Sequence, residues 1–288
     1  MKRLVIFTSI AMIAAAVFCW FLIYDDTHEG TPHGIVHNVK VIAHRGASAY
    51  APENTLAAFR KAVELGADII ELDIHQTKDS QIVVIHDATV DRTTNGRGKI
   101  ADHTLDELRQ LNAGSWFSPS FVNEKIPLLQ EVFERTPDSV LLLIELKAGS
   151  PYYPDIEKRV IHLIRGEKAV HRVIIKSFQD DILETIRAQA PDIPRLKVFV
   201  TEISLLNIII EHGINFGTVL DDSVQYLQHH WFGLSDDFLN ASHQKGYTVF
   251  AWGVNSERQM RSLIAKGIDG IETDYPDKLR SLLSPAKP

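Results

Sequence analysis

The sequence predicts a (β/α)8 barrel, the TIM-barrel fold, on the strength of three observations. From residue 39 onward, short β-branched runs alternate with amphipathic helical patterns, as is typical of parallel strands joined by crossover helices. Eight strand-like runs are present, the number that closes a barrel. The chain has 288 residues, enough for a single barrel of about 250. A doubly wound open sheet is the alternative.

The expected strands and helices follow one another in order along the chain. Strands are expected at Val39 to His44, Ile69 to Gln76, Val140 to Lys147, Arg172 to Phe178, Leu196 to Val200, Gly217 to Leu220, Thr248 to Val254 and Gly270 to Thr273. Helices are expected at Thr55 to Leu65, Asp155 to Ala169, Asp180 to Ala190, Ser204 to His212, Leu234 to Lys245 and Ser256 to Lys266. A further short strand, Ile82 to His86, leads into a polar stretch that breaks the alternation. We therefore expect a small insertion after the second strand, over about residues 87–130.

The N-terminus carries an apolar run from Leu4 to Tyr24, preceded by Lys2 and Arg3 and followed by acidic residues. A transmembrane helix needs about 20 apolar residues, whereas the apolar part of a cleavable signal peptide has about 7 to 15. The sequence therefore predicts a signal anchor over residues 1–26, a linker over 27–38 and the barrel over 39–284. The flanking charges place the barrel on the extracytoplasmic side. Cleavage near Ala14 to Ala16 is the alternative, and would make the domain secreted or periplasmic.

Charge and cysteine content narrow the class of protein. The formal net charge is -7, and a nucleic-acid binder would normally present a basic face. The single cysteine, Cys19, lies inside the N-terminal apolar run. The barrel is therefore expected to fold without an intramolecular disulfide, as its size permits.

Acidic residues cluster at the ends of two expected strands. Glu71 and Asp73 are separated by one residue, so both side chains lie on the same face of a strand. Glu145 and Lys147 have the same spacing at the end of the next long strand. Three carboxylates facing a barrel interior favour a hard divalent ion such as Mg²⁺ or Ca²⁺, and Lys147 could hold a phosphate oxygen. The alternative is that these acids are solvated or salt-bridged at wet strand ends.

Two histidines are expected near this cluster. His44, followed by Arg45, ends the first expected strand, and His86 ends the short strand before the insertion. One histidine at a strand end is more often a surface or capping residue. Two imidazoles beside a metal suit phosphoryl transfer, because one accepts a proton from the attacking hydroxyl while the other donates one to the leaving oxygen. The ion, Arg45 and Lys147 would stabilise the developing charge.

Taken in order, these motifs resemble those of the glycerophosphodiester phosphodiesterases. The matching segments are His44-Arg45-Gly46, Pro52-Glu53-Asn54-Thr55, Glu71-Leu72-Asp73, His86-Asp87, Glu145-Leu146-Lys147, Ala251-Trp252-Gly253-Val254-Asn255 and Gly267 to Pro276. The resemblance covers nearly all of Val39 to Leu283. Each segment alone is weakly specific, but their shared order leaves little room for coincidence.

The resemblance implies a (β/α)8 barrel and a role for each matching residue. It implies that the acid/base pair is His44 and His86, that the metal ligands are Glu71, Asp73 and Glu145, that the substrate-binding residues are Arg45, Lys147 and Trp252, and that Glu53 supports the site. The chain departs from the family at two positions. The family more often has threonine or another polar residue at Gly253, and an apolar residue at Glu272.

The reaction implied by the resemblance is hydrolysis of a glycerophosphodiester to glycerol 3-phosphate and an alcohol. The glycerol 2-hydroxyl could attack phosphorus to give a cyclic phosphate, or water could attack directly, and the sequence does not choose. Two other functions stay open: a lysophospholipase D-type activity on lysophospholipids, and a non-catalytic membrane-anchored binding protein on the same fold. The second is disfavoured because every proton-transfer and metal position is occupied by a costly buried charge.

Overall fold

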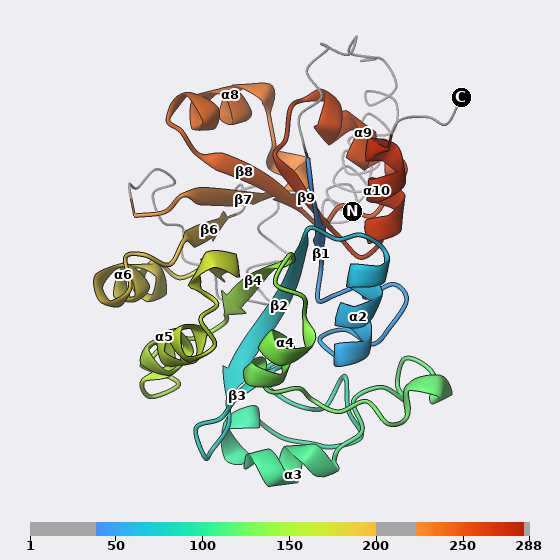
Figure 1. Ribbon diagram of the computed structural model, residues 1–288, viewed down its shortest axis with the longest axis vertical. Helices are drawn as coiled ribbons and strands as arrows, with labels where there is room; N and C mark the ends of the chain where they lie inside the picture. The colour runs from blue at the N-terminus through green and yellow to red at the C-terminus, as the bar shows by residue number, and fades with distance from the viewer. Residues whose placement is uncertain (1–38, 200–222, 285–288) are drawn as a thin grey trace, which may run out of the picture. The chain divides into compact units, whose positions relative to one another are not determined.

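The strands of the protein close into a parallel barrel. The computed structural model describes residues 39–199 and 223–284 (Figure 1). Nine strands form one sheet in the order β1-β9-β8-β7-β6-β5-β4-β2-β3, and an additional pairing of β1 with β2 closes it. Only β3 runs antiparallel, against β2, among the strand pairs described. The predicted (β/α)8 barrel is confirmed.

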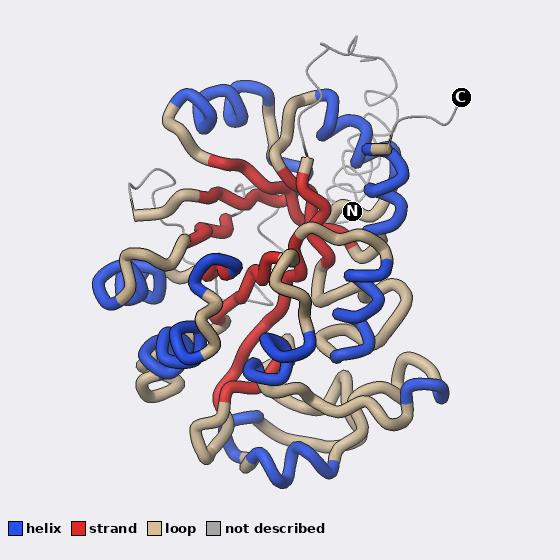
Figure 2. The backbone as a smooth tube through the Cα atoms, viewed as in Figure 1, coloured by secondary structure: helices blue, strands red, loops and turns tan. Residues whose placement is uncertain are grey.

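The elements alternate between strand and helix. The strands are β1 (Lys40–Ala43), β2 (Ile69–Gln76), β3 (Ile82–Val84), β4 (Leu141–Leu146), β5 (Val173–Ser177), β6 (Arg195–Phe199), β7 (Tyr226–His230), β8 (Thr248–Trp252) and β9 (Gly270–Thr273). The helices are α2 (Leu56–Glu64), α3 (Leu105–Gln110), α4 (Leu129–Arg135), α5 (Ile156–Gly166), α6 (Asp180–Gln189), α8 (Asp236–Gln244), α9 (Glu257–Ala265) and α10 (Pro276–Leu283). The helices lie outside the strands (Figure 2).

Helix α2 shows how the local sequence sets an element. Thr55 is its N-cap, and the Thr55 hydroxyl accepts a hydrogen bond from the backbone N–H of Ala58. Such a cap stabilises a helix by about 1 kcal/mol. The helix buries Ala57, Ala58, Phe59 and Ala62. It therefore begins directly after the segment that, as described below, reaches into the site.

The barrel interior has an apolar layer beneath a charged one. Ile42, Ile69, Leu143, Ile174, Leu196, Val198 and Phe250 form a buried cluster distinct from the larger core. Side chains two positions apart on a strand share a face. The interior positions that follow Ile69, Leu143 and Ile174 are Glu71, Glu145 and Lys176. The strands thus fill the lower barrel with hydrocarbon and present charges toward their C-terminal ends, where barrel enzymes have their sites.

The strand between β6 and β8 is not the predicted one. The sequence places it at residues 217–220, which lie outside the described residues, but in the structure β7 (Tyr226–His230) pairs with both β6 and β8. The sequence did not predict a strand at Tyr226–His230 because β7 lacks an apolar run: Gln228, His229 and His230 make up most of it. The helix predicted at Ser204 to His212 also lies outside the described residues, and α10 was not among the expected helices.

The polar stretch after β3 forms a small substructure beside the barrel. It contains short 3-10 turns at Ile100–Asp102 and Pro119–Phe121 and the helix α3 between them. Its buried residues form a separate small core. They are Val83, Ile85, Val90, Ile100, Leu108, Ala113 and Ile126. This stretch brings its first residues, His86 and Asp87, to the rim of the barrel.

Within residues 39–199 and 223–284, no helix has the length and apolar character needed to cross a membrane. The N-terminal run from Leu4 to Tyr24 and the linker up to residue 38 lie outside the described residues. The signal anchor therefore stays a prediction from the sequence.

Candidate active site

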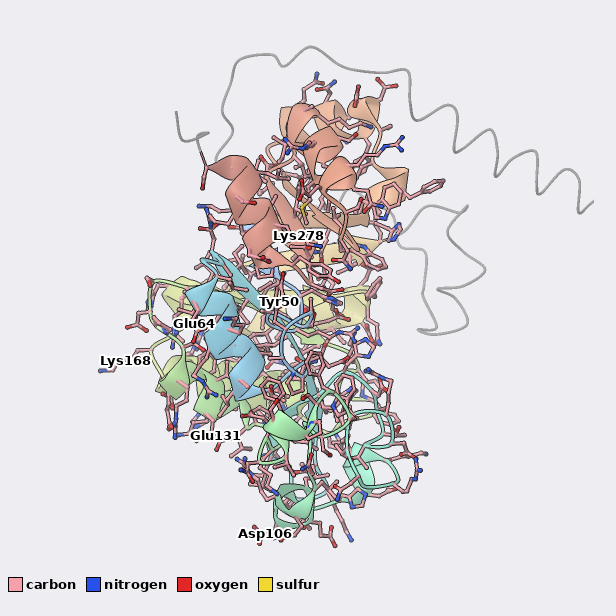
Figure 3. All side chains as sticks on the ribbon, turned by 90° about the vertical axis from the view of Figure 1, so that its right-hand side faces the viewer. Tyr50, Glu64, Asp106, Glu131, Lys168 and Lys278 are labelled. Carbon is pink, nitrogen blue, oxygen red and sulfur yellow. The ribbon has the colours of Figure 1, made fainter. Side chains whose placement is uncertain are left out.

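Four carboxylates are buried at the C-terminal ends of the barrel strands. Glu71 and Asp73 are each 1% exposed, Glu145 is 3% exposed and Glu272 is 2% exposed. Glu64, by contrast, is exposed on the outer surface of helix α2 (Figure 3). Burying an ionised carboxylate is costly unless cations or hydrogen bonds compensate for it. This concentration of buried charge therefore indicates a functional site.

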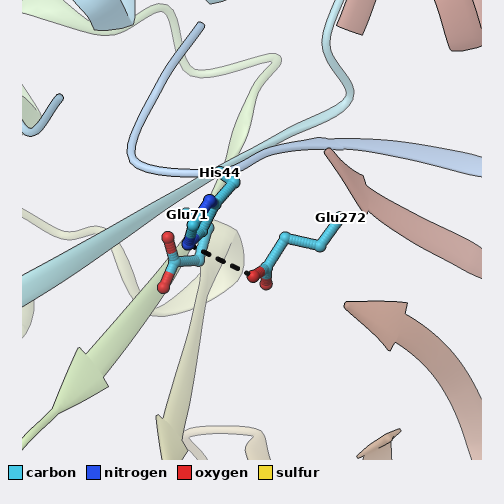
Figure 4. A group of neighbouring side chains, drawn as sticks. All are labelled: His44, Glu71 and Glu272. Carbon is cyan, nitrogen blue, oxygen red and sulfur yellow. Dashed lines mark ion pairs between the residues drawn. The ribbon is translucent and has the colours of Figure 1, made fainter. Parts of the chain in front are cut away.

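The structure brings the three predicted metal ligands together. Ligand oxygens of Glu71, Asp73 and Glu145 all lie within 4.8 Å of one another, so this group could hold a metal ion. His44, Glu71 and Glu272 form a second group by the same criterion (Figure 4). Oxygen ligands of the first group suit Mg²⁺ or Ca²⁺ better than a metal that prefers sulfur or nitrogen.

Lysine side chains compensate part of this negative charge. Lys147 Nζ lies 2.7 Å from Glu145 Oε1 and 3.0 Å from Asp73 Oδ1. Against the effect of burial, Lys147 and other cations hold the pKa of Asp73 well below its usual range and lower that of Glu145 to about 2. Burial dominates at Glu71 and raises its pKa to about 7. Glu71 is therefore the carboxylate of the group that titrates near neutrality.

A left-handed turn directs Arg45 toward the acids. Arg45 has φ 53° and Gly46 has φ 83°; a Cβ on Gly46 would lie 2.7 Å from the backbone of Ala58, so only glycine fits there. The Arg45 backbone N–H donates to Glu71 Oε2 at 2.9 Å. Its guanidinium donates to Glu53 Oε1 at 2.8 Å and its Nε lies 3.4 Å from Asp73 Oδ2.

Glu53 and Asn54 belong to the same stretch of chain. Asn54 has φ 56° and donates from Nδ2 to Asp73 Oδ2 at 2.8 Å, while the Asp73 backbone N–H donates to Asn54 Oδ1. Glu53 accepts from Arg92 as well as from Arg45. The predicted supporting role of Glu53 corresponds in the structure to holding two arginines rather than joining the group of ligands.

His44 follows β1 and is bound through one ring nitrogen. Its Nδ1 lies 2.7 Å from Asp274 Oδ1. Its Nε2 lies 3.8 Å from Glu272 Oε1, the contact marked by a dashed line in Figure 4. Burial and Arg45 act to lower the pKa of His44, but the bond to Asp274 and the charges of Glu272 and Glu71 raise it above the usual value. In turn the His44 contact lowers the pKa of Asp274 to about 2, against the effect of burial.

His86, which follows β3, shows the same arrangement. Its Nδ1 lies 2.7 Å from Asp87 Oδ1, and Asp87 accepts a hydrogen bond from Arg92 Nε at 2.8 Å. The His86 carbonyl accepts from His75 Nε2 at 2.9 Å, which fixes the backbone. Each predicted acid/base histidine therefore meets an aspartate through Nδ1, an arrangement that sets the tautomer of the ring.

The comparisons with known proteins agree with this geometry. Residues 44–278 match the model of the glycerophosphoryl diester phosphodiesterase family. The chain belongs to this family. It is therefore a phosphoric diester hydrolase.

Individual relatives cover most of the chain. A glycerophosphodiester phosphodiesterase of Caldanaerobacter subterraneus subsp. tengcongensis is 41% identical over 246 residues, covering 84% of this chain and 97% of the relative. One of Bacillus subtilis is 31% identical, covering 83% of this chain and 84% of the relative. The structure of an Oleispira antarctica phosphodiesterase in complex with sn-glycerol-3-phosphate is similar with a TM-score of 0.74 and 30% identity, covering 84% and 95% of the two chains.

Opposite the acids, the phosphodiesterase barrel presents aromatic rings. Trp252, at the end of β8, lies with its ring centroid 4.7 Å from that of His230 and 6.4 Å from that of Phe178. Trp252 Nε1 and His230 Nδ1 are buried and make no hydrogen bond within the described part of the chain. At Gly253, a Cβ would lie 3.0 Å from His230 Nε2. The departure from the family at Gly253 thus makes room for this histidine.

Sequence reasoning missed several residues of the site. Lys176 lies among the acids, and its signal was a single lysine in the otherwise apolar strand β5. Asp274, which holds His44, stood inside the Gly267 to Pro276 segment without a role of its own. Glu272 was noted only as a departure from the family. His230 was missed because the strand that carries it, β7, was not predicted.

Proposed function

We propose that this protein hydrolyses glycerophosphodiesters to glycerol 3-phosphate and an alcohol, using one divalent ion and the His44/His86 pair. The observation that carries the proposal is the pairing of two histidines, each bound through Nδ1 to an aspartate, with one buried group of three carboxylates. Family membership and the relative that binds sn-glycerol-3-phosphate support the substrate class.

Glu71, Asp73 and Glu145 would hold the ion, with Mg²⁺ or Ca²⁺ fitting their oxygen atoms. The ion, when bound, would polarise a phosphoryl oxygen and offset the charge that develops there. Arg45 and Lys147 already contact these carboxylates, so their positive charge faces the same place. Both side chains are suited to binding the remaining phosphate oxygens.

The two histidines would carry the protons. As the attacking oxygen, from the glycerol 2-hydroxyl or from water, forms its bond to phosphorus, one imidazole takes its proton at Nε2. The bond from phosphorus to the alcohol oxygen breaks as the other imidazolium donates a proton to that oxygen. Attack by water gives glycerol 3-phosphate directly, whereas attack by the 2-hydroxyl gives a cyclic phosphate. Water then opens this ring at phosphorus, with the two imidazoles in exchanged roles, and the 2-hydroxyl leaves with a proton. Asp274 and Asp87 stabilise whichever ring is charged. The pH dependence of kcat/KM in the Asp274→Asn variant would show which of the two, His44 or His86, is the acid and which is the base.

The test measures glycerol 3-phosphate release by the purified chain from glycerophosphocholine and glycerophosphoethanolamine, before and after chelation. We expect activity to be lost with chelator and restored by Mg²⁺ or Ca²⁺. Undiminished turnover in excess chelator, with no metal bound to the protein, would refute the proposed dependence of activity on a divalent ion. Lysophospholipids are included in the assay, because turnover on them alone would assign a lysophospholipase D activity instead.

The location is proposed on sequence grounds. The apolar run from Leu4 to Tyr24, with Lys2 and Arg3 on its near flank, would anchor the chain in a membrane with the barrel on the extracytoplasmic side. A protease added to intact cells or spheroplasts should then digest the barrel. Full protection of the barrel would contradict this topology, whereas recovery of a shortened soluble form would indicate cleavage of the run.

A further inference from the structure

Lys176 lies at the centre of the buried acids. Its side chain projects from β5, and the residue is 4% exposed. Its Nζ lies 3.0 Å from Glu71 Oε1, 3.2 Å from Glu145 Oε2 and 3.1 Å from Glu272 Oε2. These carboxylates come from β2, β4 and β9. One ammonium group therefore links two of the proposed metal ligands to a carboxylate that is not among them.

Glu272 is the partner of Lys176 that lies outside the proposed ligand group. It accepts from Gln228 Nε2 at 2.7 Å in addition to contacting Lys176. Glu272 is 2% exposed and adds a buried negative charge to the site beyond those of the three proposed ligands. A buried charge of this kind is tolerated only with a compensating partner, and Lys176 is that partner.

The charges in the site nearly balance before any metal ion binds. Glu71, Asp73, Glu145 and Glu272 are negative when ionised, and Arg45, Lys147 and Lys176 are positive. The interaction between charges a few ångströms apart is strong in a buried site. Removing one positive or one negative charge should therefore change the affinity for a divalent cation in opposite directions.

We propose that Lys176 is a fixed internal cation that positions Glu71 and Glu145 and, balanced by Glu272, sets the affinity of the site for its divalent ion. Lys176 is a positioning residue, because it acts through the ligands rather than on the substrate. It also occupies oxygens of Glu71 and Glu272, two members of the second group able to hold a metal. The site therefore takes one ion rather than two. This inference rests on the proposed metal-dependent function.

The experiment measures Mg²⁺ and Ca²⁺ binding to the full chain by titration calorimetry at pH 8. Lys176→Met should bind the ion about tenfold more tightly or better, and Glu272→Gln about tenfold more weakly. The double variant Lys176→Met/Glu272→Gln should return to near the wild-type affinity. The wild type should bind one ion per chain.

A matched control comes from the neighbouring strand. Lys197 on β6 is also buried, at 5% exposed, but its Nζ contacts the Phe178 carbonyl and Asp180 instead of the acid cluster. Lys197→Met should leave the metal affinity unchanged. Thermal melting of every variant with and without metal separates affinity from folding.

Three outcomes overturn the inference. The first is weaker binding in both single variants, because that would mean that the two residues only support the structure. The second is unchanged affinity in Glu272→Gln, which decides the matter alone if Lys176→Met does not fold. The third is a double variant, Lys176→Met/Glu272→Gln, whose metal affinity is lower than that of either single variant. A wild-type chain that binds no divalent ion contradicts the proposed metal centre itself, and so is distinguishable from these.

Discussion

Two histidines at the same end of the barrel lie in opposite environments. His44, after β1, contacts Asp274 and lies near Glu272, and these carboxylates raise its pKa despite burial. His230, at the end of β7, stacks edge-on against Trp252, and burial lowers its pKa to about 4. His44 is therefore able to carry a proton near neutrality, whereas His230 stays neutral. The same side chain has a raised or a lowered pKa according to its neighbours.

The difference extends to the two sides of the barrel mouth. Strands β2, β4, β5 and β9 supply carboxylates and the Lys176 ammonium group, which suit the phosphate and the metal. Strands β7 and β8 end in His230 and Trp252, which offer apolar area with buried polar atoms that have no partner within the described residues. We infer that the charged side performs the chemistry and that the aromatic side contacts the organic part of the substrate. The following predictions test that division.

The largest effect is expected from the acid/base pair. His44→Ala or His86→Ala should lower kcat by about 100-fold or more, the usual contribution of general acid/base catalysis. The two groups act in one step, so the double variant should be little worse than the poorer single variant. Turnover, melting temperature and metal content are measured together. A folded His86→Ala protein with near-normal turnover would end the assignment of His86.

Substitution of a carboxylate in the proposed ligand group should weaken metal binding more than it impairs proton transfer. Asp73→Asn removes a buried charge that Lys147 and Asn54 hold in place. We expect the metal affinity to fall about tenfold or more, with partial recovery of activity in excess metal, because a ligand is weakened rather than a proton donor lost. Metal titration of activity checks this. Unchanged metal affinity in a folded variant would remove Asp73 from the ligand set.

Asp274 should control the pH dependence of His44. Its negative charge favours the imidazolium, so Asp274→Asn lowers the pKa of His44. The limb of the kcat/KM profile that His44 sets should then move to lower pH. If the acid limb moves, His44 is the base, and if the alkaline limb moves, His44 is the acid. A profile that keeps both limbs in place would show that Asp274 does not act through His44.

Glu71 allows a pH test on the metal instead of the proton transfers. Burial raises its pKa to about 7, so the metal-free carboxyl is protonated below that pH. The ion needs the carboxylate, and binding must release the proton. Metal affinity should therefore fall as pH drops from 8 to 6, with proton uptake by the buffer seen in calorimetry. Affinity that is independent of pH over that range would contradict this reading of Glu71.

The charged side was largely predictable from the sequence, and the aromatic side was not. The sequence singles out three acidic residues, Glu71, Asp73 and Glu145, because a charge in a buried strand is costly unless it has a partner or a function. Side chains alternate between the two faces of a strand, so the spacing of Glu71 and Asp73 predicts that they share one face. Lys176 and Asp274 were missed because their partners lie on other strands. Strand β7 was missed because Gln228, His229 and His230 break the apolar pattern, although in the structure Gln228 and His229 are buried.

The smallest effect is expected on the aromatic side, and it is the one that tests the division most directly. Trp252→Leu removes ring area that contacts His230 and Phe178, and an aromatic contact contributes about 1 kcal/mol, or roughly two- to tenfold in binding. KM should therefore rise by that factor while kcat changes little, and the rise should depend on the alcohol part of the substrate. His230→Leu should behave in the same way and leave both limbs of the pH profile unmoved, because His230 is already neutral at the pH of the assay. The reverse pattern, a fall in kcat with KM unchanged, would place the aromatic rings in the chemical step and remove the contrast with His44.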